Sequence, residues 1–146
     1  MKRLDNLEQR VNAFMGQLEL GDAYRENGVS VIRSSDATLL VSCFSQDDST
    51  WCRISAIMLL DLEPTLEVLH RILQLNNDVL MGGLRLFQDR TLVFSTTLQG
   101  DTLDGDSFAQ ALRYAAHVAT VQGSLLRSLT HAQSGADLLQ EAPPCG

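Results

Sequence analysis

The sequence predicts an α+β domain in which three helices pack against an antiparallel five-stranded sheet, in the order α-β-β-β-α-β-β-α. Helical and strand-like hydrophobic patterns follow one another along the chain in that order, and short turns join consecutive strands. The 146 residues, 45% of them apolar, are enough for one hydrophobic core and too few for two. We therefore expect a single domain over residues 1–130 and a flexible C-terminal tail over residues 131–146.

The first helix is predicted over residues 2–20. Apolar side chains recur there at steps of three and four residues, which places them on one face, while polar side chains fill the other face. Gly21 ends the pattern, and Glu26-Asn27-Gly28 is typical of a turn. The apolar face consists of Leu4, Leu7, Val11, Phe14 and Leu18.

Three strands are expected next, over residues 29–33, 38–44 and 51–59, as a meander of β-branched and apolar runs. The second and third strands carry apolar side chains on both faces. Either both faces are interior to the domain, or one face or edge is left for another chain. On the second strand Leu39, Val41 and Cys43 oppose Leu40 and Phe44, and on the third Ile54 and Met58 oppose Trp51 and Ile57.

A second helix is predicted after Pro64, which the first turn of a helix tolerates, and Asn76-Asn77-Asp78 ends it. Two strands follow, over residues 80–87 and 91–98, with Gly82-Gly83 expected at a bulge or a close backbone contact. The apolar stripe of this second helix is predicted to consist of Leu66, Leu69, Ile72 and Leu73.

The third helix is the longest, with Asp106 as its expected N-cap and Thr130 near its end. Alanine-rich stretches permit close approach to a sheet, and Gly123 is a local weak point. The helical spacing is carried by Phe108, Leu112, Ala115, Ala119, Leu126 and Leu129.

Catalytic and metal-binding patterns are missing from the sequence. His70, His117 and His131 stand singly, without the spacing that directs two imidazoles at one metal. The acidic segment 101–106 lacks the ligand spacing of a calcium loop and is better explained by turn and cap chemistry. No nucleotide fingerprint or nucleophile elbow is present. We therefore expect no enzyme, no metal and no cofactor.

Three cysteines leave at least one unpaired, which fits reduced thiols better than a disulfide framework. Cys43 and Cys52 fall on neighbouring strands around a hairpin loop, so they could come close. Burial as small apolar side chains explains them better than a redox pair does. Cys145 lies in the expected tail.

The charge balance bears on partners and location. With 18 acidic and 11 basic side chains, the net charge of −7 disfavours nucleic acid and anionic membranes. No apolar run reaches the roughly 18 residues of a membrane span, and a charged segment follows Met1 where a signal peptide would be apolar. A cytoplasmic protein that binds neither nucleic acid nor membranes is expected.

Four segments together resemble the class I chaperones of type III secretion, the CesT-like family, and the resemblance covers residues 2–130. A helix ending in a leucine-asparagine pair (Leu69–Asn77) is followed by a two-strand hairpin and by the opening of a last amphipathic helix. The hairpin contains Gly82–Leu86 and Thr91–Phe94, and the helix opening is Leu103–Phe108. The resemblance implies a homodimer that keeps the N-terminal segment of a secreted effector extended, by strand addition and apolar grooves.

By position, the resemblance also assigns two sets of residues. Effector-facing patches would include Leu7, Val11, Phe14, Val29, Val31, Leu39 and Val41. The dimer contact would include Leu66, Leu69, Ile72, Leu84 and Leu86. Two alternatives stay open: a YbjN-like regulatory or protein-binding domain of similar fold, and a small enzyme with an unrecognised site.

Overall fold

The computed structural model describes residues 2–18, 20, 22–33, 37–130 and 133–134. In this part of the chain, six strands form an antiparallel sheet in the spatial order β1-β2-β3-β4-β6-β5, and a short seventh strand, β7, pairs with β4. The elements are α1 (Lys2–Gln17), β1 (Asp22–Glu26), β2 (Val29–Arg33), β3 (Thr38–Gln46), β4 (Ser49–Leu60), α2 (Leu66–Asp78), β5 (Gly83–Leu86), β6 (Leu92–Gln99), α3 (Gly105–Thr130) and β7 (Gln133–Ser134).

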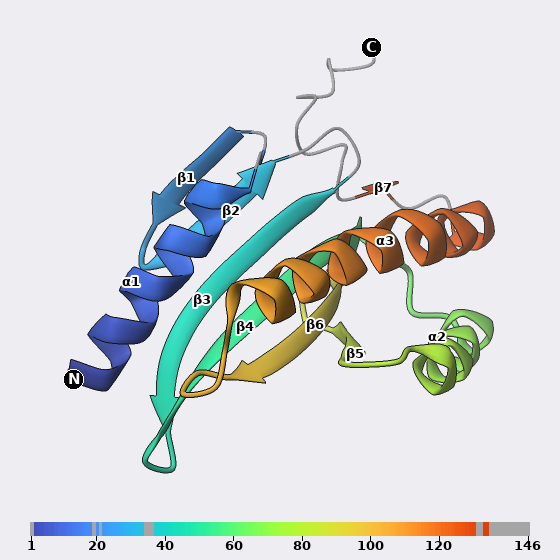
Figure 1. The fold of residues 1–146 in the computed structure, drawn as a ribbon. Helices are drawn as coiled ribbons and strands as arrows, with labels where there is room; N and C mark the ends of the chain where they lie inside the picture. Colours follow the sequence, from blue (N-terminus) through green and yellow to red (C-terminus); the bar gives the residue numbers. More distant parts are fainter. Residues whose placement is uncertain (1, 19, 21, 34–36, 131–132, 135–146) are drawn as a thin grey trace.

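The three helices are arranged unequally around the sheet (Figure 1). Helices α1 and α3 lie across one face, where α1 contacts β3, β4 and α3, and α3 contacts β3, β4 and β6. Helix α2 lies at the end of the sheet, against α3 and β5. The core lies between the sheet and the helices, and its fully buried side chains include Leu7, Ile54, Met58, Phe94 and Phe108.

The alternation expected for β3 and β4 is observed. Leu39 and Val41 face the helices and are buried, whereas Leu40 and Phe44 lie on the opposite face and are partly exposed. The register continues this division across the sheet, because Val41 pairs with Ile54 and Leu40 pairs with Ser55. The α+β class is therefore confirmed, with apolar side chains on both faces of the sheet.

The predicted number of strands was wrong, because the sheet has six strands in its main path and not five. The missing strand is β1, whose sequence Asp22-Ala23-Tyr24-Arg25-Glu26 has little apolar alternation. It forms because Asn27 and Gly28 adopt positive φ angles of 53° and 79°, the conformation of a tight hairpin turn. β1 lies at the edge of the sheet, so its side chains remain exposed and leave no hydrophobic pattern in the sequence.

Two helix boundaries also differ from the prediction. Helix α1 ends at Gln17, three residues before the predicted end at residue 20. The cap of α3 is Asp104 and not Asp106, since its Oδ1 accepts a hydrogen bond of 2.7 Å from the backbone N–H of Ser107. The acidic segment 101–106 therefore supplies a turn and a helix cap, although the capping carboxylate comes two residues earlier than predicted.

The glycine pair before β5 makes the close backbone contact that was predicted. Gly82 has a φ of 82°, and a Cβ on it would lie 2.3 Å from the carbonyl oxygen of Ser95 in β6. Only glycine fits this position without a shift of the backbone. The strand starts after it, at Gly83, so β5 is shorter than the predicted 80–87.

The segment 131–146, which was predicted to be a flexible tail, is described only at residues 133–134. Gln133 and Ser134 form β7 beside β4, although they belong to the segment expected to be a flexible tail. The rest of 131–146, including His131 and Cys145, lies outside the described residues.

Candidate functional site

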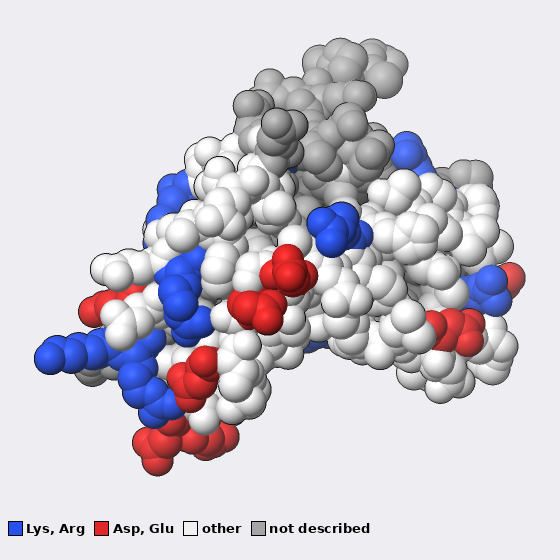
Figure 2. Space-filling view, in the orientation of Figure 1, with Lys and Arg blue, Asp and Glu red and all other residues white. Residues whose placement is uncertain are grey.

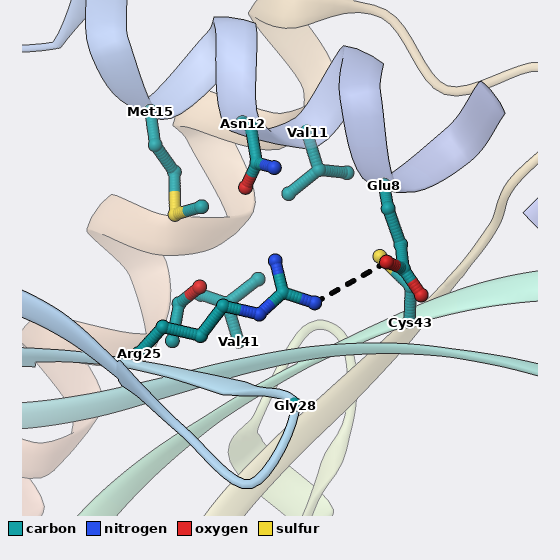
Figure 3. A pocket seen from close by; sticks show the side chains of 9 residues that line it. Glu8, Val11, Asn12, Met15, Arg25, Gly28, Val41 and Cys43 are labelled. Carbon is teal, nitrogen blue, oxygen red and sulfur yellow. Dashed lines mark hydrogen bonds and ion pairs between the residues drawn. The ribbon is translucent and has the colours of Figure 1, made fainter. Parts of the chain in front are cut away.

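A groove runs between α1 and the strands β1 to β3, and we call it the α1 groove (Figure 3). Met15 and Asn12 project into it from the helix, and Arg25 reaches across from β1. Towards the C-terminal end of α1 it opens into a hollow of about 430 Å³. The two parts of the groove share Asn12, Met15, Arg25 and Ser30 as lining residues.

Helical spacing explains which side chains of α1 line the groove. Leu7 and Val11, four residues apart, are buried against the core. Glu8, Asn12 and Met15 lie next to them on the helix, so they border the buried face and point towards the strands. The wall of the groove is therefore a strip of mixed polarity at the margin of the apolar face.

The edge of the sheet lies beside the groove, because β1 is the first strand in the spatial order. A two-residue turn at 27–28 makes Glu26 and Val29 a hydrogen-bonded pair, after which hydrogen-bonded and non-hydrogen-bonded pairs alternate along the hairpin. Arg25 and Ala23 occupy non-hydrogen-bonded positions, so their backbone N–H groups point away from β2. This edge has the geometry that accepts a further strand.

An ion pair crosses the groove between Arg25 of β1 and Glu8 of α1, with 3.2 Å between Nη2 and Oε2 (Figure 3). Both side chains are substantially exposed, so the pair contributes little to stability, about 0–1 kcal/mol. A ligand that entered the groove could displace it at little cost. Helix α1 is held independently by Arg10, which donates hydrogen bonds to the carbonyl oxygens of Gly100 and Leu103 at 2.7 and 2.9 Å.

The groove also contains one thiol with a perturbed pKa. The thiol of Cys52 donates a hydrogen bond to Cys43, and this lowers the pKa of Cys43 below its ordinary value. Burial and the Glu8 carboxylate oppose that shift, while Arg25 and Arg10 support it. The wall of the groove therefore carries a sulfur with increased thiolate character.

A second exposed feature is an apolar row on α2, which we call the α2 stripe and which consists of Leu66, Leu69 and Leu73. Their exposed fractions are 85%, 37% and 67%, and their spacing places them on one side of the helix. Figure 2 shows a mostly neutral surface with scattered charges over α2 and the C-terminal half of α3, whereas charges gather near α1 and the β3–β4 turn. This stripe is apolar surface that the described residues leave exposed.

The residues assigned to effector binding lie in different environments. Val11 and Val41 line the α1 groove. Phe14 is half-buried and packs on Phe108, with ring centroids 5.8 Å apart. Leu7 and Leu39 are buried in the core and present almost no surface in this conformation. Val29 and Val31, on β2, share the sheet face with Leu40, opposite to the face on which Val41 lines the groove.

The residues assigned to the dimer contact also divide into two groups. Leu66 and Leu69 belong to the exposed α2 stripe, and Leu86 is 36% exposed on β5. Ile72 and Leu84 are each only 7% exposed and belong to the core of this chain. The single stripe predicted for this helix is in fact two rows, since the core-facing row is Val68, Ile72 and Leu75.

Sequence reasoning missed Asn12, Met15 and Arg25 as groove residues. Asn12 directly follows Val11, and Met15 directly follows Phe14, and both of these preceding residues belong to the predicted apolar face. This position in the sequence is the signal that could have placed Asn12 and Met15 at the margin of that face. Arg25 could not be found, because the strand that carries it was not predicted. Asn76 was noted only as a helix end, but its Oδ1 accepts a hydrogen bond of 2.6 Å from the N–H of Leu84 and holds β5 to α2.

Neither a metal site nor a membrane-spanning helix is found among the described residues. They contain no group of three or more histidine, cysteine, aspartate or glutamate side chains that could hold a metal ion. They also contain no helix that combines the length and apolar character needed to cross a bilayer.

The arrangement of helices and strands is that of the type III secretion chaperones and of YbjN. The chaperone SycH of Yersinia pestis, solved in complex with a stable fragment of YscM2, matches with a TM-score of 0.58 at 13% identity. That match covers 79% of this chain and 98% of SycH. YbjN from E. coli matches with a TM-score of 0.54 at 14% identity, covering 80% of this chain and 91% of YbjN. At such identities the likeness establishes the fold.

The sequence itself establishes the family. Residues 5–131 match the model of the family described as T3SS (YopN, CesT) and YbjN peptide-binding chaperone 1, and the chain belongs to this family. The resemblance to the type III secretion chaperones is thereby confirmed at the level of a family that also includes YbjN. No curated protein matches the chain significantly.

Proposed function

We propose that this chain is a non-enzymatic secretion chaperone that acts in the cytoplasm and holds the N-terminal segment of a secreted effector in an extended conformation. Membership of a peptide-binding chaperone family supports the proposal. The observation that carries it is the juxtaposition of an open strand edge at β1 with the partly apolar α1 groove.

The proposed binding mode is strand addition at β1. The outward N–H groups of Ala23 and Arg25 pair with carbonyl groups of the segment, and alternate side chains of the segment enter the groove. Met15 suits such a site because its flexible thioether adapts to different side chains. The net charge of −7 favours segments that are basic.

The proposed assembly is a symmetric homodimer through the α2 stripe. Leu66, Leu69 and Leu73 form an apolar row that a second copy of the chain covers with its own identical row, as a two-fold axis requires. Leu86 is exposed on β5, which packs against α2, and is proposed to contribute to the same contact. In this arrangement both α1 grooves stay free, because α1 packs on β3, β4 and α3, whereas α2 packs on α3 and β5.

The alternative function is that of a YbjN-like domain that binds peptides without a role in secretion. It deserves equal testing because the likeness to YbjN covers as much of the chain as the likeness to SycH. The two functions differ in their clients: a secretion chaperone prefers N-terminal segments of secreted proteins, whereas a general binder accepts other extended segments of similar composition.

The test is fluorescence anisotropy with labelled synthetic peptides that tile the N-terminal segments of secreted effectors, alongside scrambled peptides of the same composition. We expect saturable binding of particular effector peptides and not of their scrambled versions. Met15→Glu should weaken it, because a charge enters the groove wall, while Leu125→Glu, on the exposed side of α3, should not. Equal binding of scrambled peptides would favour the YbjN-like function.

Strand addition has a separate signature in the same assay. Peptides with single backbone N-methyl groups should lose binding at every second position, because alternate N–H groups of an added strand face the β1 edge. Uniform tolerance of N-methylation would contradict strand addition, and no binding of any effector peptide would contradict the proposed client class.

A further inference from the structure

Cys43 of β3 and Cys52 of β4 lie directly opposite each other in the sheet, on the face that carries α1 and α3. The hairpin between them turns at residues 47–48, where both φ angles are positive, at 55° and 62°. In a two-residue hairpin the pair next to the turn is hydrogen-bonded, and the pairs then alternate. Counted from Gln46 and Ser49, the two cysteines occupy a non-hydrogen-bonded position.

That position has the dimensions of a disulfide. Opposite residues of a non-hydrogen-bonded pair have Cα atoms about 4.5 Å apart, and a disulfide spans about 4.4–6.8 Å between Cα atoms. Both side chains project from the same face of the sheet, because residues directly opposite each other in an antiparallel pair do so. The pair can therefore be joined while β3 and β4 keep their register.

The two thiols differ in access and in acidity. Cys43 is half-buried and lines the α1 groove, whereas Cys52 is fully buried behind it. The hydrogen bond from Cys52, aided by Arg25 and Arg10, lowers the pKa of Cys43. The same hydrogen bond, together with burial, raises the pKa of Cys52. Cys43 is thus the less buried of the two sulfurs and the one with thiolate character, and Cys52 is the protonated thiol on the neighbouring strand.

We propose that Cys43 and Cys52 form a thiol–disulfide exchange site in the wall of the α1 groove that reacts with low-molecular-weight disulfides of the glutathione class. The thiolate of Cys43 attacks one sulfur of the disulfide, so that a mixed disulfide forms and one thiolate leaves. Cys52 then loses its proton to that thiolate and attacks Sγ of Cys43, which expels the second small thiolate. The two protein thiols are oxidised, and the small disulfide is reduced to two thiols, the second taking the remaining proton from solvent.

The reaction requires the hairpin, the two sulfurs and an unoccupied α1 groove, and it does not require that the groove bind a peptide. Peptide binding and thiol exchange can therefore fail or succeed separately. The pair also explains why β3 and β4 place two cysteines at one register position, where two small apolar side chains would satisfy packing alone.

The test is mass spectrometry of the folded protein after incubation with oxidised glutathione, in a Cys145→Ser background that leaves only this pair. We expect the loss of two hydrogen atoms, a Cys43–Cys52 linkage in the peptide map, and full reversal by dithiothreitol. Adding Cys52→Ser should trap one glutathionyl group on Cys43. Adding Cys43→Ser should leave Cys52 unmodified, because it is buried.

Three results would overturn the proposal. The first is that Cys43 and Cys52 both stay free thiols in the folded protein, although the same treatment oxidises them when the chain is unfolded in denaturant. The second is a stable glutathione adduct on Cys43 while Cys52 is present. The third is modification of Cys52 in the Cys43→Ser variant. Circular dichroism verifies folding, and Cys52→Ala replaces Cys52→Ser if the serine variant does not fold.

Discussion

The replacement of Leu73 by alanine tests the proposed dimer at its most informative position. Leu73 is 67% exposed in the single chain, so about two thirds of its surface is available for a partner. The core-facing row of α2, which includes Ile72, is left intact by the change. The substitution therefore acts mainly on association and only slightly on folding.

The magnitude follows from the buried surface. The substitution of leucine by alanine removes three carbon atoms. At about 0.8 kcal/mol of hydrophobic free energy for each buried carbon, full burial of the three contributes about 2.4 kcal/mol. Because about two thirds of Leu73 is exposed before association, the dimer contact loses about 1.6 kcal/mol of binding free energy for each protomer. A symmetric dimer loses it twice, about 3 kcal/mol in all, which is roughly a hundredfold increase in the dissociation constant.

Sedimentation equilibrium over a range of concentrations measures this dissociation constant. Leu125→Ala is the matched control, since Leu125 is 47% exposed but lies on α3, outside the α2 stripe. Leu69→Glu should separate the protomers completely, because it places a charge in a desolvated contact. A monomeric wild-type protein at all concentrations, or equal effects of the Leu73 and Leu125 variants, would refute the assignment of the stripe.

Three further changes have expected outcomes. Gly123→Ala should raise the free energy of unfolding in urea by about 0.5–1 kcal/mol, because alanine favours the helix and its Cβ makes only ordinary contacts; a decrease would show that the site is too tight. Asn76→Ala should lower it by about 1–3 kcal/mol, since the N–H of Leu84 loses its acceptor, and an unchanged value would contradict that role. Cys52→Ala should raise the pKa of Cys43, so that alkylation of Cys43 by iodoacetamide starts at higher pH; an unshifted profile would contradict the hydrogen bond.

The thiol prediction depends on charged neighbours as well as on Cys52. Arg25 and Arg10 favour the thiolate of Cys43, and Glu8 disfavours it. Arg25→Gln should therefore shift the alkylation profile in the same direction as Cys52→Ala, and less strongly, because the hydrogen bond is the larger cause.

Hydrophobic periodicity was sufficient to predict most of the fold. The three helices and five of the strands have apolar faces that pack on one core, and such faces leave a regular spacing in the sequence. β1 left no such signal, because an edge strand with exposed side chains is stabilised by backbone pairing with β2 and by the turn at 27–28. Backbone pairing cannot be read from side-chain polarity.

The α2 stripe shows a different limit. Leu66, Leu69, Ile72 and Leu73 fit one broad apolar face by spacing alone. The structure places Ile72 in the core, leaves Leu66 and Leu73 mostly in solvent, and leaves Leu69 partly exposed. Val68 and Leu75 complete the core-facing row. The sequence shows that α2 carries more apolar side chains than a single buried row contains. Which row is buried is decided by the packing of α2 against α3 and β5.

The candidate site was predictable only in part. Val11 and Val41, which the resemblance assigns to effector binding, lie in the wall of the α1 groove. The groove also depends on the approach of α1 to a strand that was not predicted, so Arg25 and the open edge were missed. The sequence predicted that Cys43 and Cys52 could lie close together, because they flank a hairpin loop. It did not predict that they form a non-hydrogen-bonded pair, since that depends on the two-residue turn at 47–48.

The most direct test of the central claim is amide hydrogen exchange by NMR, with and without a bound effector peptide. A peptide added to the sheet should slow exchange of the outward N–H groups of Ala23 and Arg25. No comparable slowing is expected along β5, at the opposite edge. Slowed exchange in residues 83–86 with unchanged exchange in β1 would contradict this claim.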